Sequence, residues 1–276
     1  MPAEIGAGAI GLGWRPENAS FVLAHVSLGF VEVMAEGVPE VDRLPLALEA
    51  IRRRGMAVVP HGVSLSLGGA DWPDRYRLRH LAALADTLDA PFVSEHIAFV
   101  RTGRLDAGVL LPVPRTREAL DVLVENVRIA QQELPVPLAL ENVASIFEWP
   151  EAELDEADFV AELLERTDAL LLLDVANLYA NGRNHGFDPV THLDRLPLER
   201  LAYVHVAGGT EVAGTYLDTH DCAVPREVLS LLHEVTSRCP AVPVLLERDR
   251  NHPCEAELQA DLDRIAATQR RGARVG

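Results

Sequence analysis

Residues 170–177 read Leu-Leu-Leu-Leu-Asp-Val-Ala-Asn, an apolar run that ends in a carboxylate. A parallel strand that is covered on both faces shows this continuous, rather than alternating, hydrophobicity. Seven further runs of the same kind occur along the chain, namely Ala9–Gly13, Phe30–Glu36, Ala57–Ser66, Pro91–Phe99, Pro137–Val143, Leu201–Gly208 and Val242–Asp249. We therefore expect eight buried parallel strands, the sixth of which covers Leu170–Asn177.

Amphipathic segments with helical spacing lie between these runs, among them Arg75–Leu88, Arg115–Glu133, Pro225–Arg238 and Glu255–Thr268. Thr116 is suited to begin the second of them. Strands that alternate with helices are joined by right-handed parallel crossovers. Eight such units favour a closed (β/α)8 barrel, the TIM barrel, over an open doubly wound sheet. No Gly-x-Gly-x-x-Gly turn supports a dinucleotide-binding fold.

Length and composition fit one barrel domain over residues 1–276, since such barrels reach roughly 250 residues undivided. No apolar stretch approaches the roughly 20 residues of a membrane span, and the acidic start lacks a basic signal region, so a cytoplasmic protein is expected. The net charge of −17 argues against a nucleic-acid partner. Cys222, Cys239 and Cys254 are too few for a disulfide framework and are expected to be reduced thiols.

Ionisable side chains stand where the apolar runs end. Active sites of (β/α)8 barrels lie at these carboxyl ends. In chain order the residues are Glu36, His61, His96, Glu141 beside Asn142, Asp174 near Asn177, His205 and Glu247. The loop after the seventh run adds Asp218 and His220, whose spacing lets both face one point from an extended backbone. These side chains are expected to converge at one mouth of the barrel.

Each residue alone has an ordinary explanation. A single His at a strand end is more often a structural hydrogen-bonding group than a metal ligand, and Glu141 or Asp174 could cap the next helix. The set is harder to explain, because Glu141, Asp174, Asp218 and Glu247 would repel one another and lose hydration in a narrow mouth. The chain contains no lysine to neutralise them. Bound cations are therefore expected.

Four histidines with four carboxylates suit iron, manganese or zinc better than magnesium or calcium. Eight ligands exceed the needs of one ion, so we expect two or three ions, with Glu141 available as a bridge. No Cys stands at a strand end, which disfavours a structural zinc site. The remaining histidines in helical segments, His25, His80, His192 and His233, are expected at the surface or in packing, and His252 is left open.

Short motifs run in order through nearly the whole chain, at Gly8–Pro16, Phe30–Glu36, His61–Ser66, Ser94–His96, Pro112–Leu120, Leu140–Asn142, Leu172–Tyr179, Asn184–Asp188, His205–Gly208, Asp218–Asp221 and Leu246–Asp249. In these motifs the chain resembles the multinuclear non-haem iron-dependent oxidases, a (β/α)8 family long known as a domain of unknown function. The resemblance implies two or three irons, mixed Fe(II) and Fe(III), that activate O2 to modify a ribosomally made precursor peptide. Cysteine is that family's commonest target; other members act on aspartate, asparagine or C-terminal residues.

The resemblance also implies roles for individual residues. By motif position the iron ligands are His61, His96, Glu141, Asp174, His205, Asp218, His220 and Glu247. Glu141, Asp174, His205 and Glu247 form the expected catalytic set within them. Asn177 belongs to the same motif as Asp174 and would ligate or support a ligand. Residues at or just beyond strand ends are expected to hold substrate, namely Arg15, Asn142, Asn184, His185 and Arg248.

The chain departs from the family pattern at three places. Gly37 follows Glu36 where Asn is usual, Ala176 replaces the first Asn of a D-V-N-N motif, and Gly209 stands where a His commonly ends H-L-A-G-H. None of these changes removes an expected ligand. They bear on the outer pocket, and so on the class of substrate.

A partner and two other functions are also considered. Leader recognition usually needs a separate element, and the chain has no residues to spare for a fused one, so we expect a partner protein or a leader bound at the rim. One alternative function is a metal-dependent hydrolase or isomerase of the barrels related to xylose isomerase and endonuclease IV. The charge counts against the DNA-repair version, and the lack of lysine against a sugar isomerase. The other alternative is a non-catalytic, metal-dependent peptide-binding scaffold with saturated ions.

Overall fold

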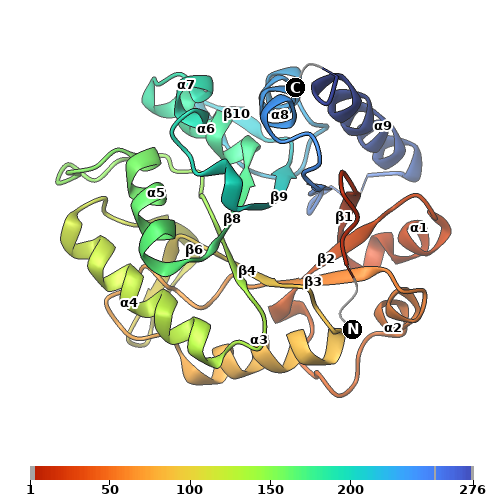
Figure 1. The fold of residues 1–276 in the computed structure, drawn as a ribbon, viewed down its shortest axis with the longest axis horizontal. Helices are drawn as coiled ribbons and strands as arrows, with labels where there is room; N and C mark the ends of the chain where they lie inside the picture. Colours follow the sequence, from red (N-terminus) through yellow and green to blue (C-terminus); the bar gives the residue numbers. More distant parts are fainter. Residues whose placement is uncertain (1–3, 252, 275–276) are drawn as a thin grey trace.

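Eight parallel strands close into a barrel in the computed structural model, which describes residues 4–251 and 253–274. Around the barrel the order is β1 (Ile10–Trp14), β12 (Val244–Leu246), β9 (Leu201–Val206), β8 (Leu170–Asp174), β7 (Leu138–Glu141), β4 (Val93–His96), β3 (Ala57–His61) and β2 (Phe30–Met34). Figure 1 shows the helices arranged around the outside of these strands. The predicted (β/α)8 barrel is confirmed, and each of the eight predicted runs contains one barrel strand.

The outer ring contains α1 (Ala19–Ala24), α2 (Leu46–Arg53), α3 (Arg75–Leu88), α4 (Arg117–Glu133), α5 (Glu156–Thr167), α6 (Val175–His185), α7 (Pro189–Leu193), α8 (Arg226–Arg238) and α9 (Glu255–Gly272). Short 3-10 turns lie at Pro16–Asn18, Ala35–Gly37 and Leu198–Arg200. The four predicted helices are confirmed, with α9 reaching beyond the predicted Thr268. Thr116 caps α4 as predicted, because its hydroxyl accepts a hydrogen bond from the Ala119 amide at 3.1 Å.

Seven of the eight predicted strands are too long at their carboxyl ends, whereas the first ends one residue short of β1. The sixth was expected to continue to Asn177, but α6 begins at Val175 because the Asp174 carboxylate accepts hydrogen bonds from the amides of Ala176 and Asn177 at 2.6 and 2.8 Å. Hydrophobicity alone could not separate strand from helix in this run, and the cap decides it.

Two antiparallel hairpins were not predicted. β5 (Ala98–Thr102) pairs with β6 (Leu105–Pro112) directly after β4, and β10 (Thr210–Val212) pairs with β11 (Thr215–Leu217) after β9. The predicted fourth run, Pro91–Phe99, therefore spans the end of one strand and the start of another. Both hairpins follow carboxyl ends of barrel strands, so they stand at the mouth where the ionisable residues were expected.

The hydrophobic core has two parts, which alternate along the strands. Leu171 and Leu173 belong to the large cluster packed between the barrel and the helices. Leu172 lies in a smaller cluster made of Phe30, Ala57, Val59, Ala139, Leu172, Tyr203 and Leu245, which we call the inner core. Since successive side chains of a strand point to opposite faces, the inner core fills the barrel lumen. Gly11 leaves room for it, because a Cβ there would lie 2.7 Å from the Phe30 ring.

Residues outside the mouth behave largely as expected. Cys222, Cys239 and Cys254 are free thiols. His25 stacks on Phe21 with ring centroids 3.7 Å apart, and His192 stacks on Phe187 at 5.0 Å; His80 contacts the Ala35 carbonyl oxygen at 3.0 Å, and His233 lies in α8. His252 lies outside the described residues. Within the described part of the chain, no helix combines the length and the apolar character that crossing a membrane requires.

Candidate metal centre

Six barrel strands carry an ionisable residue on their inward face, two positions after an inner residue of the same strand, and a seventh, β12, is directly followed by one. The pairs are Phe30 and Glu32, Val59 and His61, Ser94 and His96, Ala139 and Glu141, Leu172 and Asp174, Tyr203 and His205, and Leu245 and Glu247. The two-residue period keeps both members of a pair in the lumen. We call the second members, Glu32, His61, His96, Glu141, Asp174, His205 and Glu247, the ionisable layer; each is at most 7% exposed.

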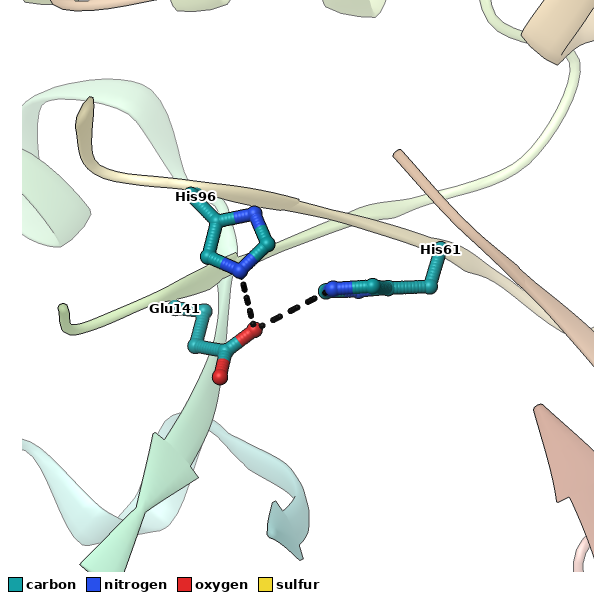
Figure 2. Close-up of side chains that lie close together, drawn as sticks. All are labelled: His61, His96 and Glu141. Carbon is teal, nitrogen blue, oxygen red and sulfur yellow. Dashed lines mark ion pairs between the residues drawn. The ribbon is translucent and has the colours of Figure 1, made fainter. Parts of the chain in front are cut away.

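Glu141 lies at the centre of this layer. Its Oε2 atom is 3.5 Å from His61 Nε2 and 3.3 Å from His96 Nε2, and Figure 2 shows both imidazoles directed at this oxygen. Its Oε1 atom is 3.2 Å from His205 Nδ1. That nitrogen is also 3.0 Å from Glu247 Oε2. One carboxylate therefore faces three imidazoles that come from three different strands.

Three overlapping groups of side chains have ligand atoms close enough to share an ion. Within each group the atoms lie within 4.8 Å of one another. The groups are His61, His96 and Glu141; Glu141, Asp174, His205 and Glu247; and His220, Glu247 and Asp249. Glu141 joins the first group to the second, and Glu247 joins the second to the third. Seven of the eight predicted ligands are therefore brought together, with the eighth, Asp218, bound to His220.

Unpaired buried atoms test whether this layer fits cations. Among residues 4–251 and 253–274, six atoms of the predicted metal ligands and of Asn177 are buried without a hydrogen-bond partner, namely Glu141 Oε2, Asp174 Oδ2, Asn177 Oδ1, His205 Nδ1, Asp218 Oδ1 and Glu247 Oε2. Such atoms are rare in folded proteins, and each costs about 1–3 kcal/mol when nothing binds it. Five of the six are carboxylate or imidazole atoms, the donors that iron, manganese and zinc accept. The residues therefore fit a multi-metal site.

The electrostatics of the layer point the same way. Burial opposes protonation of His96, but Glu141 and Glu95 outweigh it and raise the His96 pKa to about 9. Burial and the neighbouring His96 lower the His61 pKa to about 3. Burial, with the charges of Asp218 and Glu141, raises the Asp174 pKa well above its usual value. Without a cation, the excess negative charge is balanced by protons on ligand atoms, and a bound cation would displace them.

The loop after β11 brings its two predicted ligands together. His220 Nε2 lies 2.7 Å from Asp218 Oδ2, and His220 Nδ1 lies 3.2 Å from Asp249 Oδ2. Arg15, which is expected to bind substrate, pairs with the other oxygen of Asp249 at 2.5 Å. Burial alone would raise the pKa of Asp249, but the His220 hydrogen bond and Arg15 lower it to about 2. Asp249 is thus held as an anion within the third group.

Neutral amide side chains fix the backbone beneath the carboxylates. The Asn142 amide bonds both backbone atoms of Asp174, donating to its carbonyl oxygen at 3.0 Å and accepting from its N–H at 2.9 Å. Asn177 donates to the Asn142 carbonyl at 3.0 Å. Asn181 donates to the Val143 carbonyl and accepts from the Ser145 amide. Asn142 and Asn177 therefore hold the strand ends that carry Glu141 and Asp174.

The other residues expected to hold substrate are used by the fold itself. Asn184 bonds the backbone of Tyr216 and Ser145. His185 Nε2 contacts the Ser145 hydroxyl at 2.9 Å, and Arg248 donates to Asp261 in a buried ion pair at 2.9 Å. Glu36, the last residue of the second predicted run, accepts a hydrogen bond from the Ser64 hydroxyl and belongs to none of the three groups.

Sequence reasoning missed Glu32, Glu95 and Asp249. Glu32 accepts from Tyr203 and lies 2.8 Å from His205 Nε2. Glu95 accepts from the amides of Leu65 and His96, both at 2.8 Å, in space that Gly62 leaves open, since a Cβ there would lie 2.8 Å from its carboxylate. Glu32 and Glu95 lie within the predicted runs rather than at their ends. The two-residue period of inward positions would have revealed Glu32.

The fold and the ionisable layer define a class, the xylose-isomerase-like TIM barrels with a candidate multi-metal mouth. Solved structures of that architecture include endonuclease IV from Thermus thermophilus (TM-score 0.62, 19% identity, 93% of this chain and 98% of that chain). A xylose isomerase domain protein from Planctomyces limnophilus is also similar (0.61, 16%, 98% and 99%), as is D-psicose 3-epimerase from Clostridium cellulolyticum (0.60, 14%, 96% and 98%). At these identities the likeness concerns the fold alone.

The sequence identifies the family. The model of the RiPP precursor modification enzymes MbnB/TglH/ChrH, which act on precursors of ribosomally made, modified peptides, matches residues 9–270, and the chain belongs to this family. A UPF0276 protein of Streptomyces avermitilis is 52% identical over 271 residues, which is 96% of this chain but 55% of the relative's length. A UPF0276 protein of Caulobacter vibrioides is 38% identical over 256 residues, 92% of this chain and 91% of the relative.

Proposed function

We propose that this chain is a multinuclear iron-dependent oxidase that uses O2 to modify a ribosomal precursor peptide, with cysteine as the target. Membership of the precursor modification family supports the peptide substrate. The proposal that the site binds metal rests on one observation. Within the described part of the chain, buried ligand atoms without hydrogen-bond partners lie close together on Glu141, Asp174, His205 and Glu247. Iron agrees with the mixed nitrogen and oxygen donors and with the motif resemblance described above.

The three groups suggest how two or three ions would be held. His61, His96 and Glu141 would hold one, and Asp174, His205 and Glu247 would share Glu141 to hold a second. His220 with Asp218 or Asp249 would complete a third site. Bound iron would supply redox chemistry with O2 and lower the pKa of a thiol that binds to it.

The protein's own contribution is to position the ligands and to exclude water. His205 and Asp174 are fully buried, and His61 is 3% exposed, so charges interact strongly in this layer. Substrate would enter from the mouth. A pocket of about 450 Å³ lies beside the loop that follows His61, lined in part by Glu36, Gly62, Ser64, Tyr76, Arg77 and His80. We propose that this pocket receives residues of the peptide, since the other polar residues expected to do so are mostly engaged in the fold.

The decisive experiment combines metal analysis with a peptide assay. The protein is produced with Fe(II) under nitrogen and then mixed with the peptide encoded by the adjacent small open reading frame, with and without O2. We expect more than one iron per chain and an O2-dependent mass change on a cysteine. The same peptide with that cysteine replaced by serine is the matched control and should keep its mass.

Other outcomes would identify the alternatives. Stoichiometric zinc or manganese without iron, and no role for O2, would overturn the oxidase and favour a metal-dependent hydrolase or isomerase. Bound iron with an unchanged peptide that nevertheless binds would favour a scaffold. If the peptide reacts only after a second protein from the same gene neighbourhood is added, the proposed partner for leader recognition is supported.

A further inference from the structure

A chain of hydrogen bonds connects three members of the ionisable layer, His61, Glu32 and His205, through Ser94 and Tyr203. His61 Nδ1 lies 2.8 Å from Ser94 Oγ, and Ser94 Oγ lies 2.8 Å from Tyr203 Oη. Tyr203 Oη donates to Glu32 Oε2, and the same oxygen is 2.8 Å from His205 Nε2. Ser94, Tyr203 and Glu32 are at most 1% exposed. Two candidate ligands on opposite sides of Glu141 are thus connected to one buried carboxylate.

When Glu32 is a carboxylate, the donors and acceptors of this hydrogen-bond network can be assigned in only one way. Tyr203 has a single hydroxyl hydrogen, which it donates to Glu32, so its oxygen must accept from Ser94. The single hydrogen of Ser94 is then used, so Ser94 Oγ must accept from the Nδ1–H of His61. Glu32 can only accept, so His205 must donate through Nε2–H. Every donor in this network therefore points toward Glu32.

This direction fixes which ring nitrogens face the site. His61, with its proton on Nδ1, keeps the lone pair of Nε2, 3.5 Å from Glu141 Oε2. His205 uses its Nε2–H for Glu32, so only Nδ1 is left to bind a metal, and Nδ1 lies 3.2 Å from Glu141 Oε1 and 3.0 Å from Glu247 Oε2. The two histidines thus offer different nitrogens, and in both cases the nitrogen offered is the one beside Glu141.

We propose that Glu32 is a positioning residue that, through Tyr203 and Ser94, selects the tautomers of His61 and His205 so that Nε2 of the first and Nδ1 of the second bind metal. The inference rests on the proposed metal-dependent function. Packing does not require the Tyr203 hydroxyl, because the Tyr203 ring packs on Phe92 and Phe30 at centroid distances of 5.3 and 6.1 Å, as well as on His205 at 5.1 Å. A buried polar network is costly unless it is fully satisfied, whereas partners that orient metal-binding histidines typically raise metal affinity about 10- to 100-fold.

Two variants interrupt the hydrogen-bond network at different points. Tyr203→Phe separates Ser94 from Glu32, leaving the Ser94 hydroxyl free to donate to His61 Nδ1, while the Glu32–His205 contact remains. Glu32→Gln replaces the acceptor shared by Tyr203 and His205, and so affects both histidines. Tyr216→Phe is the matched control, since it removes another largely buried phenol hydroxyl. That hydroxyl accepts a hydrogen bond from the Gly209 amide and takes no part in the network around Glu32.

The test uses the full-length protein, freed of metal and reloaded with Zn²⁺, with histidine labelled with ¹⁵N. Zn²⁺ affinity is measured by chelator competition, and ¹⁵N chemical shifts report which ring nitrogen binds. We expect about tenfold weaker binding for Tyr203→Phe, with only the His61 signals changed, and about 10- to 100-fold weaker binding for Glu32→Gln, with both histidines changed. The control should match the wild type.

Wild-type affinity and unchanged shifts in both variants would overturn the inference while leaving the metal site intact. Wild-type protein that binds no Zn²⁺ and no Fe²⁺ would instead refute the proposed function itself. If Glu32→Gln fails to fold, Tyr203→Phe decides the question alone, because its predicted signature, a change at His61 with His205 unaffected, is one that general destabilisation would not produce.

Discussion

The barrel lumen contains two regions that share the same strands and almost the same burial but differ in chemistry. The inner core is apolar apart from the Tyr203 hydroxyl, and that hydroxyl is hydrogen-bonded. Two residues further along each strand, the ionisable layer contains three carboxylates and one imidazole with atoms that lack hydrogen-bond partners within residues 4–251 and 253–274. Backbone and burial are common to both regions, so the difference lies in the side chains alone.

This difference separates stability from function. Apolar side chains in the lumen stabilise the fold by leaving water. Carboxylates in the same surroundings destabilise it unless a cation or a proton neutralises them. A layer that weakens the metal-free protein at several strands at once is best explained as a site maintained for ligands. Changes to the two regions should therefore have opposite signatures.

The largest effect is expected from Glu141→Gln, which removes the central charge of the ionisable layer while keeping the shape of the side chain. Metal affinity should fall about 100-fold or more, since even supporting residues are worth 10- to 100-fold. The free energy of unfolding of the metal-free variant should change little, because the relieved repulsion with Asp174 is offset by the lost attraction to protonated His96. Metal titration and urea unfolding measure the two quantities.

Glu156→Gln is the matched control for that variant. Glu156 is a carboxylate outside the three groups, and it accepts hydrogen bonds from Asn181 at 3.1 and 3.3 Å. This change should leave metal affinity unaltered. Equal loss of metal in both variants would mean that general disturbance of the fold, rather than ligation, explains the result for Glu141.

A smaller and opposite effect is expected from Leu172→Ala in the inner core, at the position paired with Glu141 across the β7–β8 ladder. The free energy of unfolding should fall by about 2–5 kcal/mol, the usual range for a buried Leu replaced by Ala. The folded variant should still bind the same number of metal ions. Loss of metal without loss of stability would contradict the division between the two regions.

The smallest effect concerns pH. The pKa of His96 is about 9 in the metal-free fold against an ordinary value of 6.5, so its proton stabilises that fold below pH 6.5, and this contribution is lost as the pH rises through 9. The metal-free protein should therefore lose about 3 kcal/mol of unfolding free energy between pH 6.5 and 9. Metal-loaded protein should not, because the ion replaces the proton. Thermal unfolding of both forms measures this. An equal fall in unfolding free energy with pH for the metal-free and the metal-loaded protein would contradict the prediction.

Much of the fold and of the candidate site could be predicted from the sequence, for identifiable reasons. Runs such as Leu170–Asp174 are long, apolar and end in a charge, so both the strands and the site residues at their ends could be located. The hairpins after His96 and Val206 could not, because short antiparallel pairs on a rim carry weak periodicity. Glu32 was missed because a charge within an apolar run is assigned to the strand, and the ion pair of Arg15 could not be foreseen because its partner, Asp249, lies 234 residues away.

The amides of Asn142 and Asn177 have a consequence for how the site can work. Amide side chains do not titrate and do not change charge when a neighbouring ion is oxidised or reduced. The strand ends that carry Glu141 and Asp174 are therefore held by side chains whose own charge stays the same when the charge of the site changes. If the site works as we propose, its ions could gain or lose electrons, and its ligands protons, while the strand ends beneath them keep the same geometry.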